Sequence, residues 1–139
     1  MHIAMIGSGY VGLVSGACFA DFGHFVTCID KDELKIAALC EGKIPIYEPD
    51  LDQLVKSGRS AGRLKFATEL GDAIAQADAV FIAVGTPSRR GDGHADLSYV
   101  YAAAREIARH LNRLCYQFVL GRPTVPLPLG PPNLLLETS

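Results

Sequence analysis

The fold is decided by the stretch MHIAMIGSGYVGLVSGACFADFG, residues 1–23. Its apolar run HIAMI (2–6) predicts a short buried strand that begins at the second residue. Apolar residues then recur at helical spacing from about Tyr10 to Phe22, which predicts a helix. Three glycines mark the junction and the start of that helix: Gly7, Gly9 and Gly12. The spacing GxGxxG between a strand and a helix is typical of a dinucleotide-binding loop.

Strand and helix patterns alternate along residues 1–120. Further strands are expected at 25–30, 64–68, 79–84 and 115–120, and helices at 32–40, within 43–63, from 68 or 69 to 76, and at 97–111. The run AVFIAV (79–84) is apolar throughout, as in a strand covered on both faces. We therefore expect an α/β fold, a Rossmann-like, doubly wound parallel sheet over residues 1–120 that is incomplete at its C-terminal end.

Composition narrows the function classes. The 139 residues suffice for one domain and are 49% hydrophobic and 20% charged, as in soluble globular proteins. A net charge of −2 argues against nucleic acid or an anionic membrane as a partner. No apolar run approaches the ~20 residues that span a bilayer, and no basic region precedes the first apolar run. A cytoplasmic protein is expected.

The cysteines and histidines show no metal-ligand spacing. Four cysteines are present without a CxxC pair: Cys18, Cys28, Cys40 and Cys115. We expect reduced, buried thiols and no metal site, with disulfides as the alternative that an even cysteine count leaves open.

Each glycine of the loop has a separate role in the dinucleotide-binding interpretation. Gly7 allows the tight turn out of the strand, Gly9 lets a pyrophosphate approach the backbone, and Gly12 lets the helix lie against the sheet. The N–H groups at the helix start and the helix dipole then favour the phosphates.

Asp30 ends the second expected strand, 18 residues beyond Gly12. A carboxylate there accepts both hydroxyls of an adenosine ribose and repels a 2′-phosphate, which predicts NAD rather than NADP. The adjacent Lys31 would soften that repulsion, but the carboxylate points at the ribose in this arrangement. The alternative is that the glycines only make a turn and Asp30 caps the next helix.

The segment FIAVGTP (81–87) supplies a second candidate contact surface. Its strand is expected beside the first, across the point where strand order reverses. Gly85 and Thr86 would then offer an N–H group and a hydroxyl to the pyrophosphate or ribose. The alternative is an ordinary strand-ending turn set by Pro87.

Residues 121–139 differ from the rest of the chain. Five of the eight prolines lie between Pro123 and Pro132, which excludes a helix or an internal strand. We expect an extended, proline-rich tail there.

Three segments together carry a more specific signal: IAMIGSGYVGLVSGACFADFGH (3–24), IPIYEPDL (44–51) and FIAVGTPSRRGDGHADLSYVYAAAREIA (81–108). Over residues 1–111 the chain resembles the N-terminal, NAD-binding domain of the UDP-glucose 6-dehydrogenases. The resemblance implies a cytoplasmic, homo-oligomeric enzyme that oxidises UDP-glucose to UDP-glucuronate with two NAD. Another nucleotide sugar, such as GDP-mannose or a UDP-N-acetyl sugar, remains an alternative, as does a non-catalytic fragment.

Carried onto matching positions, the family's cofactor contacts fall on Val11, with Tyr10 beside it in the glycine loop, and on Asp30, Lys35 and Thr86. The family often has glycine where this chain has Asp50, which leaves the conformation of that loop open.

The chain departs from the family pattern after about Leu111, where only Thr124, Val125 and Pro126 match a family segment. We expect a truncated chain whose terminus diverges, as an altered reading frame would produce. The family's catalytic cysteine, lysine, glutamate and asparagine would lie in the missing part, so no residue here is nominated as catalytic. The chain alone is expected to bind NAD without turnover.

Overall fold

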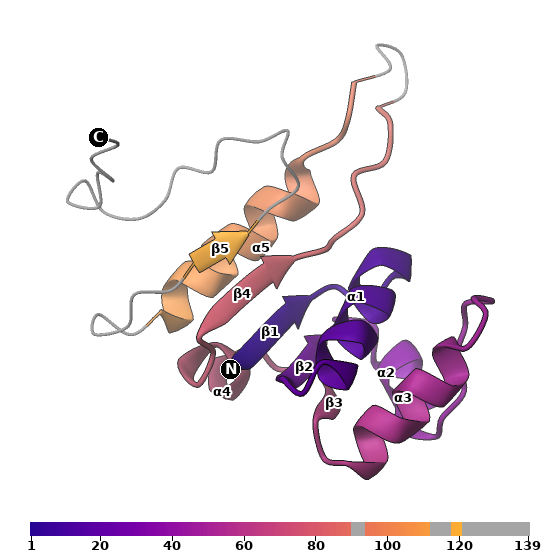
Figure 1. The fold of residues 1–139 in the computed structure, drawn as a ribbon. Helices are drawn as coiled ribbons and strands as arrows, with labels where there is room; N and C mark the ends of the chain where they lie inside the picture. Colours follow the sequence, from indigo (N-terminus) through magenta and orange to yellow (C-terminus); the bar gives the residue numbers. More distant parts are fainter. Residues whose placement is uncertain (90–93, 112–117, 121–139) are drawn as a thin grey trace, which may run out of the picture.

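The computed structural model describes residues 1–89, 94–111 and 118–120. Its elements follow one another in the order β1 (His2–Ile6), α1 (Tyr10–Asp21), β2 (Phe25–Ile29), α2 (Glu33–Cys40), α3 (Leu51–Ser60), β3 (Leu64–Ala67), α4 (Gly71–Ala75), β4 (Ala79–Ile82), α5 (Ser98–His110) and β5 (Phe118–Leu120) (Figure 1). The expected alternation of strands and helices is confirmed.

The strands form one parallel sheet in the order β3-β2-β1-β4-β5. β1 is central and pairs with β2 on one side and with β4 on the other, so strand order reverses between β1 and β4. Ile6 is in register with both Ile29 and Ile82, so these three strands end at nearly the same level. The predicted doubly wound α/β fold and the predicted neighbour of the first strand are confirmed.

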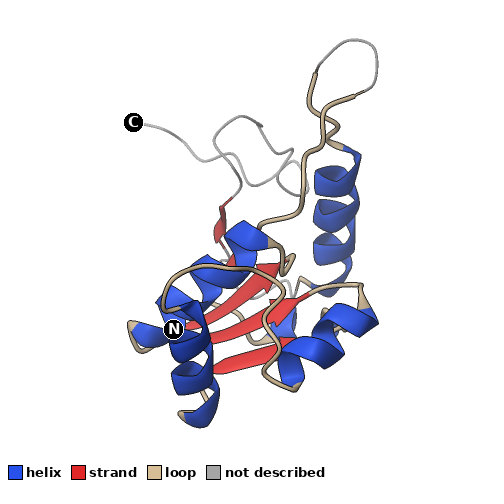
Figure 2. Ribbon diagram, turned by 90° about the vertical axis from the view of Figure 1, so that its right-hand side faces the viewer, coloured by secondary structure: helices blue, strands red, loops and turns tan. Residues whose placement is uncertain are grey.

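Helices cover both faces of the sheet (Figure 2). The side chains of β1 alternate between these faces and divide the core into two clusters. Ile3 and Met5 pack in one cluster with apolar residues of α1, α2 and α3. Ala4 and Ile6 pack in the other, with residues of α4 and α5. A strand buried on both faces must be apolar at every buried position, which explains the apolar run IAMI (3–6) after the exposed His2.

Close packing of α1 on β2 depends on a small residue. A Cβ atom added at Gly16 would lie 2.5 Å from the Cys28 sulfur, so the helix could not approach this closely with any other residue there. Cys28 is fully buried, and burial raises the pKa of its thiol to about 12. Cys18, Cys28 and Cys40 carry free thiols, as expected, but only Cys28 of these three is buried: Cys18 is half-buried, and Cys40, at the end of α2, is exposed.

Several boundaries differ from the sequence prediction. The helix expected from 68 or 69 to 76 is only Gly71–Ala75, and the buried Leu70 is its N-cap. β4 ends at Ile82, two residues early, where Ala83 packs beside the glycine loop. The strand expected at 115–120 is seen at Phe118–Leu120. Residues 112–117 and the expected tail at 121–139 lie outside the described residues.

Within the residues that the structure describes, no helix has the length and apolar character needed to cross a membrane. Over the same residues, no group of three or more metal-binding side chains comes together.

Candidate functional site

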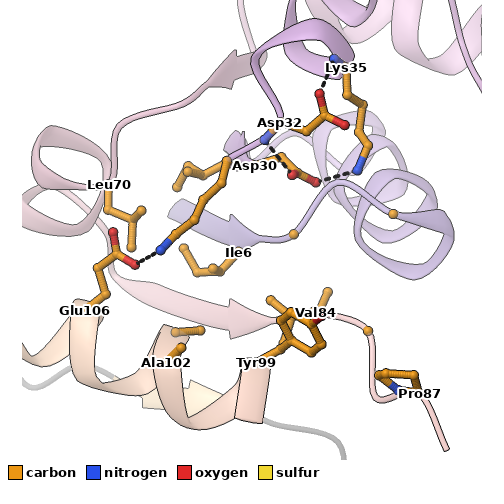
Figure 3. Close-up of a pocket in the computed structure, with 17 residues that line it drawn as sticks. Ile6, Asp30, Asp32, Lys35, Leu70, Val84, Pro87, Tyr99, Ala102 and Glu106 are labelled. Atoms are coloured by element: carbon orange, nitrogen blue, oxygen red, sulfur yellow. Dashed lines mark hydrogen bonds and ion pairs between the residues drawn. The ribbon is translucent and has the colours of Figure 1, made fainter. Parts of the chain in front are cut away.

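A cleft of about 550 Å³ lies at the carboxyl ends of β1, β2 and β4. The glycine loop and the end of β2 form one side, and the segment after β4 together with α5 forms the other (Figure 3). Apolar lining comes from residues such as Ile6, Leu70 and Tyr99. Five charged residues also line it: Asp30, Lys31, Asp32, Lys35 and Glu106. Ligands of open α/β sheets bind at such a reversal of strand order.

The glycine loop is shaped by two backbone approaches that exclude a side chain. Gly7 has a φ of +101°, and its N–H donates to the Ile29 carbonyl at 2.7 Å. A Cβ atom there would lie 2.7 Å from the Ala83 carbonyl oxygen. A Cβ atom at Gly12 would lie 1.8 Å from the Gly7 carbonyl oxygen, which is impossible without moving the loop. The predicted roles of these two glycines in the turn and in close packing are confirmed.

Gly9 differs from its two neighbours in the motif. It is exposed, and an added Cβ atom would meet no atom within 4 Å. Gly9 is the N-cap of α1, which has no side-chain cap and no acidic residue in its first turn. The positive end of the helix dipole is therefore left uncompensated by side chains of the helix itself, and the backbone is open to an anion.

Asp30 follows β2 directly and accepts four hydrogen bonds. Its Oδ2 atom accepts from the Ser8 N–H at 3.0 Å, from the Ser8 hydroxyl at 2.9 Å and from Lys35 Nζ at 2.9 Å. Its Oδ1 atom accepts from the Asp32 N–H at 3.1 Å. The cap of α2 is Asp32, whose Oδ1 accepts from the Lys35 N–H at 3.0 Å. The alternative role of Asp30 as that cap is therefore wrong.

These contacts keep Asp30 ionised. Desolvation by itself would raise its pKa, but the Lys35 ammonium and the neighbouring N–H and O–H donors lower the pKa from 3.8 to about 2. The carboxylate is thus a fixed negative charge at the carboxyl end of β2, and its side chain is only 16% exposed.

A second ion pair crosses the cleft (Figure 3). Lys31 Nζ lies 2.5 Å from Glu106 Oε2, which joins the residue after Asp30 to the middle of α5. The Lys31 side chain is 74% exposed, whereas that of Glu106 is 28% exposed, so the carboxylate is the more confined partner.

Tyr10 links the glycine loop to the segment before α3. Its hydroxyl donates to the Glu48 carboxylate, and this hydrogen bond raises the pKa of the tyrosine. In the same segment Asp50 adopts the left-handed conformation with a φ of 64°. That conformation costs a non-glycine residue free energy, which explains why glycine suits the position.

The structure places the predicted site residues in two groups. Those that line the cleft are Gly7, Gly9, Asp30, Lys35 and Gly85. Those outside its lining are Tyr10, Val11, Gly12 and Thr86. Gly12 is buried beneath the loop, and Tyr10 and Val11 are 54% and 45% exposed. The cofactor contacts themselves stay predictions at all nine positions.

Sequence reasoning missed two polar residues of this region. Ser8 is fully buried and orients Asp30, and its only signal was its place between two glycines of the motif. Glu106 gave no signal, because a single acidic residue on an amphipathic helix is most simply a solvated one.

The chain matches the family described as "UDP-glucose/GDP-mannose dehydrogenase family, NAD binding domain" over residues 1–130. It is 65% identical over 130 residues to a UDP-glucose 6-dehydrogenase of Rhizobium meliloti, covering 94% of this chain and 29% of that protein. The chain thus spans less than a third of the length of this curated relative.

Two solved structures share the fold. A GDP-mannose dehydrogenase of Pseudomonas aeruginosa superposes with a TM-score of 0.80 at 37% identity, over 87% of this chain and 28% of that one. A UDP-glucose dehydrogenase of Pyrobaculum islandicum superposes with a TM-score of 0.73 at 44% identity, over 78% of this chain and 25% of that one. The sequence match and the glycine loop with its facing carboxylate agree: this chain belongs to the UDP-glucose/GDP-mannose dehydrogenase family, in its NAD-binding domain.

Proposed function

We propose that this chain is the cofactor domain of an NAD-dependent UDP-glucose 6-dehydrogenase, which oxidises UDP-glucose to UDP-glucuronate. The 65% identity to a protein of that name supports this substrate. In this proposal the chain by itself binds NAD and does not turn UDP-glucose over, because the family resemblance nominates none of its residues as catalytic. The whole enzyme is a cytoplasmic homo-oligomer.

The observation that carries the proposal is the placement of Asp30 opposite the glycine loop. Its Oδ2 atom lies 3.0 Å from the Ser8 nitrogen, between Gly7 and Gly9. In this arrangement the amides from Gly9 onward, at the start of α1, hold a diphosphate, and the Asp30 carboxylate accepts the hydroxyls of the adenosine ribose. When bound, NAD supplies the hydride acceptor for alcohol oxidation.

Lys35 has a specific part in this proposal. A carboxylate offers about four lone-pair positions, and Asp30 already receives four donors, three of them at Oδ2. Two of these donors are backbone N–H groups, and the Ser8 hydroxyl is fully buried. The Lys35 ammonium, on a long and partly exposed side chain, is the donor that can yield its place to a ribose hydroxyl.

The remaining predicted contacts are part of the same proposal. Val11, with Tyr10 beside it, lies exposed on the first turn of α1, above the loop amides. Gly85 lines the cleft and Thr86 follows it, across the reversal of strand order from Gly7. In this proposal Gly85 and Thr86 contact the pyrophosphate or the ribose with an N–H group and a hydroxyl.

Titration of the 139-residue chain with NADH tests the cofactor proposal. The chain has no tryptophan, so the fluorescence of the reduced nicotinamide is the signal. Asp30→Asn should weaken binding about 10- to 100-fold, the worth of charge-assisted hydrogen bonds. Asp52→Asn is the matched control, because Asp52 lies on α3 outside the cleft lining. Equal affinity in the wild type and Asp30→Asn would contradict the proposal.

A GDP-mannose dehydrogenase is the second candidate, favoured by the TM-score of 0.80 to that enzyme of Pseudomonas aeruginosa. Steady-state oxidation of UDP-glucose, GDP-mannose and UDP-N-acetyl sugars by the longer protein separates the candidates. UDP-glucose is expected to be oxidised with the highest kcat/KM. The same assay on the 139-residue chain should show no turnover.

A further inference from the structure

The cleft holds two lysines beside the proposed ribose position, and both are already paired. Lys35 Nζ lies 2.9 Å from Asp30 Oδ2, and Lys31 Nζ lies 2.5 Å from Glu106 Oε2. Asp32 also lines the cleft, so among the residues that the structure describes its charged lining consists of two cations and three anions. The net charge of these five residues is therefore negative although Lys31 directly follows Asp30.

This balance bears on the choice between the two nicotinamide dinucleotides. NADP differs from NAD by a phosphate on the adenosine ribose, and a phosphate monoester carries a charge of about −1.5 to −2 near pH 7. Binding it requires a cation, and Lys31 is the residue whose exposed, flexible side chain could supply one. A lysine in this position could by itself offset part of the repulsion that the Asp30 carboxylate exerts on this phosphate.

Glu106 prevents Lys31 from interacting with this phosphate. Its side chain is the more buried of the pair, and it comes from α5 on the opposite side of the cleft (Figure 3). Drawing Lys31 toward a phosphate would leave the Glu106 carboxylate unpaired beside the same phosphate. An ion pair with an exposed lysine contributes little to stability, so the effect of this pair lies in the negative charge that it places in the cleft.

We propose that Glu106 is a specificity-determining residue that excludes NADP by holding Lys31 across the cleft and by adding a negative charge to it. This inference rests on the proposed binding of the adenosine ribose at Asp30. In this inference α5 contributes to the discrimination between NAD and NADP, in addition to the glycine loop and the end of β2.

The test compares NADH and NADPH binding to the 139-residue chain by the fluorescence of the reduced nicotinamide. Glu106→Gln should raise affinity for NADPH about 3- to 10-fold at low salt and change affinity for NADH less than about twofold. Lys31→Gln should act in the opposite direction and weaken NADPH binding further. The double variant should lose the gain of Glu106→Gln, because that gain requires the freed lysine.

The matched control is Glu41→Gln. It removes the same charge and breaks an exposed ion pair with Lys43, 2.7 Å away and outside the cleft lining. Both affinities should stay as in the wild type. A gain that disappears in 1 M salt, where the Debye length is about 3 Å, supports the electrostatic cause.

The outcomes separate this inference from the proposed function. An unchanged ratio of NADPH to NADH affinity in both Glu106→Gln and Lys31→Gln, with NADH still bound, overturns the role of Glu106 alone. Equal changes for both cofactors show a structural role and also overturn it. Absence of NADH binding to the folded wild-type chain overturns the proposed function, and this inference with it.

Discussion

At the scale of single residues, Asp30 combines a structural and a binding role. Its carboxylate joins the glycine loop, the end of β2 and the start of α2 through hydrogen bonds to Ser8, Lys35 and Asp32. A group held by so many donors is fixed before any ligand arrives. Such preorganisation lowers the cost of ordering the site on binding.

Asp30 should also make stability depend on pH. Its folded-state pKa of about 2 lies below the ordinary value of 3.8, so its contribution is complete above that value and lost as pH falls toward 2. After allowance for solvent screening, the loss is about 1–2 kcal/mol. Urea unfolding from pH 5 to pH 3 should show about half of this loss in the wild type and none of it in Asp30→Asn. Lys35→Met should raise the folded-state pKa of Asp30 toward 3.8, so the loss of stability should be smaller and should end at a higher pH. Parallel pH profiles for all three proteins would contradict the assignment.

Asp50 adopts a left-handed backbone conformation that is unfavourable for a residue with a side chain. It has a φ of 64° and, although it precedes α3 as the N-cap, its side chain makes no cap hydrogen bond. Asp50→Gly should therefore raise stability by about 0.5–1 kcal/mol, since glycine adopts this conformation without steric cost. Asp50→Ala keeps the Cβ atom and should not gain stability. A thermal melt of the three proteins decides, and a lower Tm for Asp50→Gly would contradict the prediction.

At the scale of elements, different glycines of the loop serve helix packing and cofactor binding: Gly12 is needed for packing and Gly9 for binding. Gly12→Ala should destabilise the fold by about 3 kcal/mol or more, because α1 must move off the Gly7 carbonyl oxygen. Gly9→Ala meets no atom within 4 Å and should leave the Tm within a few degrees of the wild type. It should nevertheless weaken NADH binding, because the added methyl group lies on the open face of the loop. Denaturant unfolding and NADH titration of both variants test this separation.

Equal losses of stability in Gly12→Ala and Gly9→Ala would contradict the prediction that only Gly12 is needed for packing. The binding role of Gly9 would be contradicted if Gly9→Ala bound NADH as the wild type does, since the open backbone would then not face the cofactor.

The first strand, first helix and second strand could be predicted from sequence almost to the residue. Their signals are local: an apolar run, glycines at fixed spacing and an acidic residue at a strand end. The start of α4 could not be predicted from periodicity. Leu70 packs in the core cluster that contains Ala4 and Ile6, and it precedes the helix as its N-cap. Whether an apolar residue packs within a helix or before it depends on tertiary contacts.

The parts of the site that were missed are contacts between distant segments. Lys31 and Glu106 meet only because β2 and α5 border the same cleft, and Tyr10 meets Glu48 across the loop before α3. Periodicity predicts which face of a helix is buried, but it does not predict the partner of a polar side chain. Asp30 was found because its place at a strand end has a known purpose in this motif.

At the scale of the whole molecule, cofactor binding and folding should be coupled. The cleft is built from the ends of three strands, the glycine loop and α5, so it exists only in the folded chain. A ligand that binds only the folded state stabilises it by about 2.7 kcal/mol at 100 times its Kd. For a chain of this size that corresponds to a rise in Tm of about 8–12 °C.

Thermal melts at increasing NADH concentration measure this rise in Tm, which should be much smaller in Asp30→Asn at the same concentrations. A Tm that does not move in wild-type protein at saturating NADH would mean that the cleft does not bind the cofactor in the folded state.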